Sequence, residues 1–129
     1  MLSEGSIAVK SYRVYRKLYL WHIPLLPSMI ARVTRHFTRI LLPPEVQAGK
    51  NLKFAHIGNV VIHEDTIIGD NVTIYHNVTI GTARPDLPND KAPKIGNNVI
   101  IFTGAVVLSD VPDNKIIKAN EVYYDGNRN

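Results

Sequence analysis

Two histidines, His56 and His76, stand out among the side chains that can carry out acid–base chemistry. His56 follows Phe54 by two positions, and His76 follows Ile74 by two positions. The two histidines are therefore 20 residues apart, as are Phe54 and Ile74. The chain contains no cysteine, which excludes a thiol nucleophile, thiolate metal ligands and disulfides. A neutral histidine beside an exposed groove is a usual general base for a hydroxyl group. The two histidines therefore form a candidate site, provided that the fold brings them together.

The sequence around these histidines repeats with a period of six residues. Aliphatic residues occupy the repeating position at Ile62, Ile68, Ile74 and Ile80, and again at Ile95, Ile101 and Val107. Gly, Asp and Asn stand between them and favour tight turns. This period predicts a β-helix, in which short strands joined by turns stack coil upon coil. Antiparallel hairpins are the alternative, but a strand alternates with period two and would not keep a period of six.

One irregularity in the repeat predicts where the histidines lie. From Phe54 to Ile62 there are eight residues instead of six, so a coil of three hexads takes 20 residues at this point. Phe54 and Ile74 then become stacked equivalents, and His56 and His76 lie in adjacent coils about 4.8 Å apart. Two imidazoles this close are not both cationic without cost, so we expect at least one to stay neutral near pH 7.

The alternative is that both histidines are ordinary outward-facing turn residues, because no serine, cysteine or acid is visibly placed to complete a triad. His63 has no partner at the same spacing, and we expect it to be a surface residue. His22 and His36 belong to the helical segment described next.

The chain of 129 residues is expected to form one domain with three parts. These are a helical segment at 1–44, the β-helix at 45–111 with an excursion at 82–92, and a tail at 112–129. Two amphipathic helices are predicted, from about 6 to 20 and from 28 to about 41, with prolines between and after them. Their apolar stripes are Val9, Tyr12, Tyr15, Leu18 and Tyr19, and then Met29, Ile30, Val33, Phe37, Ile40 and Leu41. We expect these helices to cap or flank the stack.

The net charge of +4 is distributed unevenly along the chain. Seven basic residues against one acidic residue give the first 44 positions a charge of +6. No RNA-binding, zinc-finger or helix-turn-helix pattern accompanies them, so a nucleic-acid partner is not expected. The apolar stretch from Leu18 is too short to span a bilayer, and no signal-peptide pattern is present. We therefore expect a cytoplasmic protein, with peripheral contact between the basic helices and the inner face of the membrane as a compatible addition.

From about 43 to 120 the chain resembles the hexapeptide-repeat acyltransferases. The branch contains serine acetyltransferases and the O-acetyltransferases of capsular and exopolysaccharide clusters, including the colanic-acid type. The resemblance rests on the segments AHIGNVVIHEDTIIGDNVTIYHNVTIG, PKIGNNVIIFTGA and VVLSDVP. It implies a left-handed parallel β-helix, so the expected fold is mainly β, with the pair of α-helices predicted above at its N-terminus. It also implies acetyl-CoA as co-substrate, no metal, and a homotrimer with active sites between subunits.

The resemblance assigns His56 as the catalytic base and places His76 where the colanic-acid type carries histidine and the serine enzymes usually carry glutamine. Ala55 stands where serine acetyltransferases have aspartate, and the segment DKAPK lacks their second histidine. We therefore expect transfer of an acetyl group from acetyl-CoA to a hydroxyl of a glycan or sugar precursor. Serine is the alternative acceptor.

Contacts with CoA are expected on the coil surface, where small residues let a ligand approach the backbone. The expected residues are Gly81, Thr82, Gly104 and Ala105, with Lys94 or Lys115 for the phosphates.

Two other functions stay open. Family members normally carry one more coil between phrases like IFTGA and VVLSDVP, so an inactive homologue serving as scaffold or subunit partner is one alternative. The other is a zinc-dependent hydratase of the carbonic anhydrase type, with His56, His63 and His76 as ligands. Its further Arg, Asp and Gln motif is not found here.

Overall fold

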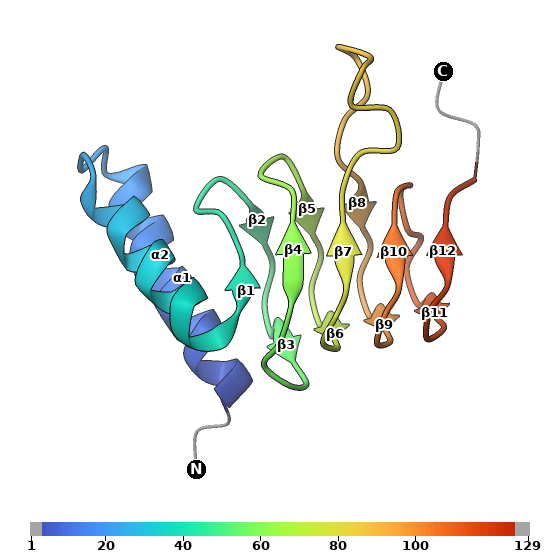
Figure 1. Cartoon of the computed structure of the whole chain (residues 1–129), viewed down its shortest axis with the longest axis horizontal. Helices are drawn as coiled ribbons and strands as arrows, with labels where there is room; N and C mark the ends of the chain where they lie inside the picture. Colours follow the sequence, from blue (N-terminus) through green and yellow to red (C-terminus); the bar gives the residue numbers. More distant parts are fainter. Residues whose placement is uncertain (1–3, 126–129) are drawn as a thin grey trace.

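The computed structural model describes residues 4–125 as two helices followed by a stack of short parallel strands (Figure 1). Helix α1 spans Glu4–Leu20 and α2 spans Leu26–Thr38. The strands are β1 (Ile40–Leu41), β2 (Gln47–Ala48), β3 (Lys53–Phe54), β4 (Val60–Ile62), β5 (Ile67–Ile68), β6 (Thr73–Ile74), β7 (Thr79–Ile80), β8 (Lys94–Ile95), β9 (Ile100–Ile101), β10 (Val106–Val107), β11 (Ile116–Ile117) and β12 (Val122–Tyr123).

The strands form three parallel sheets, and successive strands along the chain pass from one sheet to the next. The sheets have the orders β1-β4-β7-β10-β12, β2-β5-β8 and β3-β6-β9-β11. A bridge between Ile95 and Val111 extends the sheet that ends at β8. Each strand pairs with the strand one coil away, which is the arrangement of a parallel β-helix and confirms the predicted architecture.

The core lies inside the coils and is built from the repeating aliphatic positions. All seven of them are at most 3% exposed: Ile62, Ile68, Ile74, Ile80, Ile95, Ile101 and Val107. Burial of one such side chain contributes roughly 1.5–3 kcal/mol, so the period of six is the main source of stability. The hexad pattern therefore specifies both the turn positions and the core.

Helix α1 closes the first coil of the stack. Tyr12 and Tyr15 are buried, and their hydroxyls donate to backbone carbonyls of that coil, as do two arginines of the same helix. Burial raises the pKa of both tyrosines. The carbonyl acceptors are Val46 for Tyr12, Leu42 for Tyr15, Ala48 and Gly49 for Arg13, and Pro44 for Arg16. The predicted capping role is thus confirmed for α1.

Helix α2 ends earlier than predicted, and its apolar face is only partly buried. It stops at Thr38 because Arg39 adopts a left-handed conformation with φ of 58°, and the next two residues form β1. Three of the six residues of the predicted stripe are exposed, with Met29 at 61%, Val33 at 57% and Phe37 at 73%. The stripe is therefore only partly buried, since Ile40 is 2% exposed and Ile30 packs against the core. Within residues 4–125, neither helix has the length and apolar character needed to cross a membrane.

The stacked strands also extend beyond the predicted limits of 45 and 111. They begin at Ile40 and continue through β11 and β12, which pair with β9 and β10. The prediction that the β-helix ends at 111 and that a tail follows from Pro112 is therefore wrong. Asn114 has φ of 64° and makes the same kind of corner as Asn71, whose φ is 59°. The proline was therefore compatible with a repeat corner.

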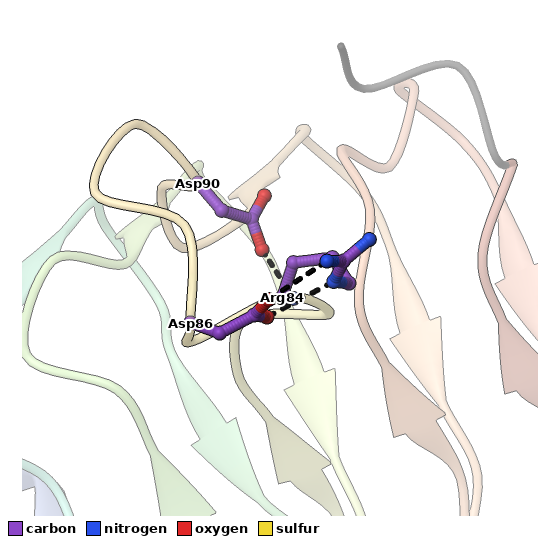
Figure 2. A network of polar contacts seen from close by, with 3 residues as sticks. All are labelled: Arg84, Asp86 and Asp90. Atoms are coloured by element: carbon purple, nitrogen blue, oxygen red, sulfur yellow. Dashed lines mark hydrogen bonds and ion pairs between the residues drawn. The ribbon is translucent and has the colours of Figure 1, made fainter.

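The excursion predicted at 82–92 is confirmed, because no strand is assigned between β7 and β8. It projects beyond one end of the strands in Figure 1. Within it Arg84 contacts two aspartates (Figure 2): the Arg84 Nε and Nη2 atoms donate to Asp86 at 2.9 and 2.7 Å. The Arg84 backbone N–H donates to Asp90 at 2.5 Å. These contacts lie within the loop itself.

Candidate active site

The candidate site is built on the turns that lead from β3 to β4 and from β6 to β7. The register pairs Phe54 with Ile74 and Ile62 with Ile80, which confirms the count of 20 residues and the two extra residues at the first turn. The ring centroids of His56 and His76 are 5.6 Å apart, with the rings inclined at 74°. The predicted juxtaposition of the two imidazoles is confirmed.

The widened turn is held in place by the end of α2. Gly58 donates its backbone N–H to the Thr38 carbonyl at 3.1 Å, and Val60 donates to the Arg39 carbonyl at 3.1 Å. Gly58 has φ of 140°, a conformation that other residues rarely adopt. A Cβ at this position would lie 3.2 Å from the His76 Cβ. Glycine therefore lets the extra residues lie close against the second histidine.

The two histidines differ in exposure. The His56 side chain is exposed and its ring also meets the edge of the Tyr75 ring, at a centroid distance of 6.2 Å. His76 is partly buried, and its carbonyl accepts hydrogen bonds from Thr103 Oγ1 at 3.0 Å and the Gly104 N–H at 3.3 Å. Its Nδ1 atom is buried without a hydrogen-bond partner among the described residues. This arrangement offers one accessible imidazole for proton transfer and a second that fixes its position.

The structure brings only part of the predicted CoA-binding set to this turn. Gly104 lies beside His76, as its hydrogen bond shows. Gly81 and Thr82 follow β7, at the other side of the same sheet, and Lys94 lies in β8 of a different sheet. The predicted set is therefore spread over different sides of the coil.

Two of these small residues have a structural explanation. Gly104 has φ of 77°, and a Cβ there would lie 1.9 Å from Asn120 Oδ1. Ala105 is 0% exposed and belongs to the core, so its prediction as a surface contact is wrong. Gly81 differs, since a Cβ there would meet nothing within 4 Å. Among the three, Gly81 is the residue whose missing side chain leaves open surface.

The zinc alternative finds no support in the described residues. Within 4–125 no group of three or more metal-binding side chains comes together. His63 lies after β4, and its Nδ1 atom accepts the Asp65 N–H at 3.1 Å. It is thus a turn residue, separate from the histidine pair.

Sequence reasoning missed a cationic cavity beside the histidine turn. Its volume is about 630 Å³, and Arg32, Arg35 and Arg39 line it together with Asn59, which lies three positions after His56. The spacing of three and four residues between the arginines predicts a shared helix face. No sequence pattern indicates that this face lies next to the β3–β4 turn.

The stacked hexads and their helix pair define a left-handed parallel β-helix, which confirms the predicted fold class. No family model matches the chain. The chain is 41% identical over 110 residues to a serine acetyltransferase of Staphylococcus xylosus, covering 85% of this chain and 50% of the relative. It is 38% identical over 120 residues to a serine acetyltransferase of Staphylococcus epidermidis, covering 92% of this chain and 56% of the relative.

Solved structures agree with these sequence relatives. The structure of Brucella abortus serine acetyltransferase in complex with coenzyme A superimposes with a TM-score of 0.85 at 26% identity, covering 92% of this chain and 48% of that chain. Soybean serine acetyltransferase apoenzyme gives a TM-score of 0.78 at 28% identity, covering 88% and 54%. The chain thus spans about half the length of the relatives it matches. These similarities support the hexapeptide-repeat acyltransferase family for this chain.

Proposed function

We propose that the protein is an acetyl-CoA-dependent O-acetyltransferase in which His56 is the general base. The observation that carries the proposal is the histidine pair on the widened turn, with ring centroids 5.6 Å apart. The similarity to serine acetyltransferases over 85% of the chain or more supports the reaction class, and the complex of one such enzyme with coenzyme A supports the donor.

In the proposed reaction, His56 accepts the proton of the acceptor hydroxyl while the oxygen attacks the thioester carbonyl of acetyl-CoA. The new carbon–oxygen bond forms, the carbon–sulfur bond breaks, and the departing thiolate takes up a proton from His56. Acetyl-CoA supplies the activated acetyl group. His76 packs edge-on against the His56 ring and acts as a positioning residue, and the Tyr75 ring restricts the same imidazole from a second side.

Serine is the acceptor that we propose to test first. The relatives and structures described above are serine acetyltransferases, and the expected glycan acceptor and role in polysaccharide biosynthesis find no support in them. Ala55 carries no charge where the resemblance places an aspartate. Recognition of the serine amino group therefore has to come from another residue.

The test is the release of free thiol from acetyl-CoA in the presence of L-serine. We expect wild-type turnover and a loss of roughly 100-fold or more in His56→Ala, the usual contribution of a general base. His63→Asn is the matched control, because asparagine keeps an acceptor for the turn hydrogen bond of His63. Equal rates in His56→Ala and wild type would end the assignment of His56.

The inactive scaffold remains the second candidate because of one observation. Val107 and Val111 are four positions apart where a regular corner uses six, so the coil surface here is shorter than a regular one. An enzyme should show a melting temperature that rises with CoA concentration, whereas a scaffold without a CoA site should not. The proposed homotrimer is tested separately, by light scattering of the purified chain.

A further inference from the structure

The cavity beside α2 collects positive charge without a counter-charge. Arg32, Arg35 and Arg39 line it with His36 and Asn59, and no carboxylate is among its lining residues. Within residues 4–125, the ion pairs found are those of His63 with Asp65 and Arg84 with Asp86, so these three guanidinium groups pair with no acidic side chain. A concave surface lined by one sign of charge concentrates the opposite charge from solution.

The helix dipole accounts for only part of this cluster. Basic residues in the last turn of a helix are favoured there, which explains Arg35 and His36. Arg32 lies one turn earlier, and Arg39 lies just beyond the helix as its left-handed cap. Like charges three and four positions apart repel one another on a helix face. An anion held between the three guanidinium groups removes this repulsion.

The number of donors indicates the type of anion. A carboxylate has two oxygens, and one bidentate guanidinium with few further donors satisfies its hydrogen-bonding capacity. A phosphate has three or more oxygens and can accept hydrogen bonds from several guanidinium groups. The cavity of about 630 Å³ is larger than one phosphate, and Leu41, Val60 and Val61 provide apolar walls. We propose that this cavity binds the phosphate group of a small phosphorylated organic molecule.

Backbone hydrogen bonds connect the end of α2, which lines the cavity, to the histidine turn. The Thr38 and Arg39 carbonyls accept hydrogen bonds from Gly58 and Val60, and Asn59 lies between these two donors. A ligand in the cavity therefore contacts the turn that begins at His56. The phosphate belongs either to CoA itself or to a separate phosphorylated molecule. Binding can be measured without acetyl-CoA, so it stands or falls independently of the proposed acetyl transfer.

The test uses inorganic pyrophosphate as the probe, titrated by calorimetry into the full chain at constant ionic strength. We expect saturable binding by the wild type, and an affinity roughly tenfold or more weaker in the variant R32Q/R35Q/R39Q. The matched control is K10Q/K53Q/K118Q, which removes the same charge from exposed lysines outside the cavity. It should keep the wild-type affinity.

Three results would overturn the proposal: no saturable binding by the wild type, no loss in the arginine variant, or an equal loss in the lysine variant. Circular dichroism checks that each variant is folded. If the triple variant does not fold, Arg35→Gln replaces it, with Arg35→Lys as its partner. Lysine keeps the charge but lacks the bidentate fork, so we expect affinity between those of wild type and Arg35→Gln.

A competition experiment identifies the source of the phosphate. If CoA displaces pyrophosphate from the wild type, the cavity receives a phosphate of CoA. If CoA and pyrophosphate bind together, the cavity serves a separate phosphorylated molecule. Thiol release in the arginine variant is then measured as an independent readout. A variant that loses pyrophosphate binding but keeps turnover separates this site from the acetyl-transfer proposal.

Discussion

Two corners of the same coil are built in opposite ways. The asparagine corner, defined by Asn51, Asn71, Asn98 and Asn114, repeats in every coil with φ between 56° and 64°. Their side-chain amides form a ladder with distances of 3.0, 3.3 and 3.2 Å. The histidine corner, defined by the equivalent positions His56, His76, Thr103 and Ala119, changes residue type in almost every coil and contains the widened turn.

The difference lies in how each corner satisfies its polar groups. In the asparagine corner, the Lys50 N–H donates to Asp70 at 2.8 Å and the Asp70 N–H donates to Asn97 at 2.7 Å, so each coil satisfies the one before. In the histidine corner, His76 Nδ1 has no partner among the described residues and His56 is exposed. Buried polar groups are normally paired, so an exception needs an explanation. The regular corner gives stability, and the histidine corner leaves the His56 imidazole exposed for chemistry.

The largest expected effect comes from making the histidine corner regular. Deletion of Ile57 and Gly58 leaves AHNVVI, which matches YHNVTI of the next coil. We expect the stack to fold, as judged by circular dichroism, because the core positions keep their register. Thiol release should fall roughly 100-fold, because the deletion removes the Gly58 contact with α2 and displaces His56. Full activity in a folded deletion variant would show that the widened turn is not needed.

A glycine of the regular corner should give the next largest effect. In Gly69→Ala the new Cβ would lie 2.4 Å from Asn97 Oδ1 and 2.8 Å from the Gly96 carbonyl group. The coils must separate to admit it, so we expect a loss of about 1–3 kcal/mol in the free energy of unfolding. Urea denaturation measures this value. Gly81→Ala is the control, since its Cβ meets nothing within 4 Å, and equal stability of the two variants would contradict the close packing.

The asparagine ladder itself should contribute less than the glycine contact. Asn71→Ala loses the ladder bonds and places alanine at φ of 59°, which costs about 1–2 kcal/mol. Asn71→Gly loses the same hydrogen bonds but tolerates the backbone angle. The difference between their urea midpoints therefore separates backbone strain from hydrogen bonding. A wild-type midpoint in Asn71→Gly would mean that the ladder adds no stability.

The smallest effect concerns the cap at the end of the stack, and it appears only at alkaline pH. Burial raises the pKa of Tyr12 and Tyr15, so the folded state favours their protonated forms. This contribution to stability is fully present below about pH 10, the pKa of tyrosine in the unfolded chain. It is lost as the pH rises through the higher pKa of the folded state. We expect the urea midpoint to fall above about pH 10, and to fall less in Tyr12→Phe. Tyr19→Phe, at a partly exposed position, is the control, and an unchanged slope in Tyr12→Phe would contradict the prediction.

Much of the fold could be predicted because the repeating aliphatic positions of the hexads are the residues that form the core. The sequence separation of 20 residues between Phe54 and Ile74 then predicted that the two histidines lie in adjacent coils. The end of the stack could not be predicted, because a proline such as Pro112 usually indicates the end of a repeat. In the structure Asn114 forms a further corner of the stack. The cationic cavity could not be predicted either. It depends on how α2 packs beside the β3–β4 turn, and a helix pattern contains no information about its neighbour.

The excursion between β7 and β8 has a practical consequence. Within this loop Arg84 is bound to Asp86 and Asp90, and no strand is assigned to it. Leu87 in this loop is 45% exposed. An epitope or fluorescent dye attached at Leu87 would therefore be accessible from solution and would lie outside the coils that carry both imidazoles.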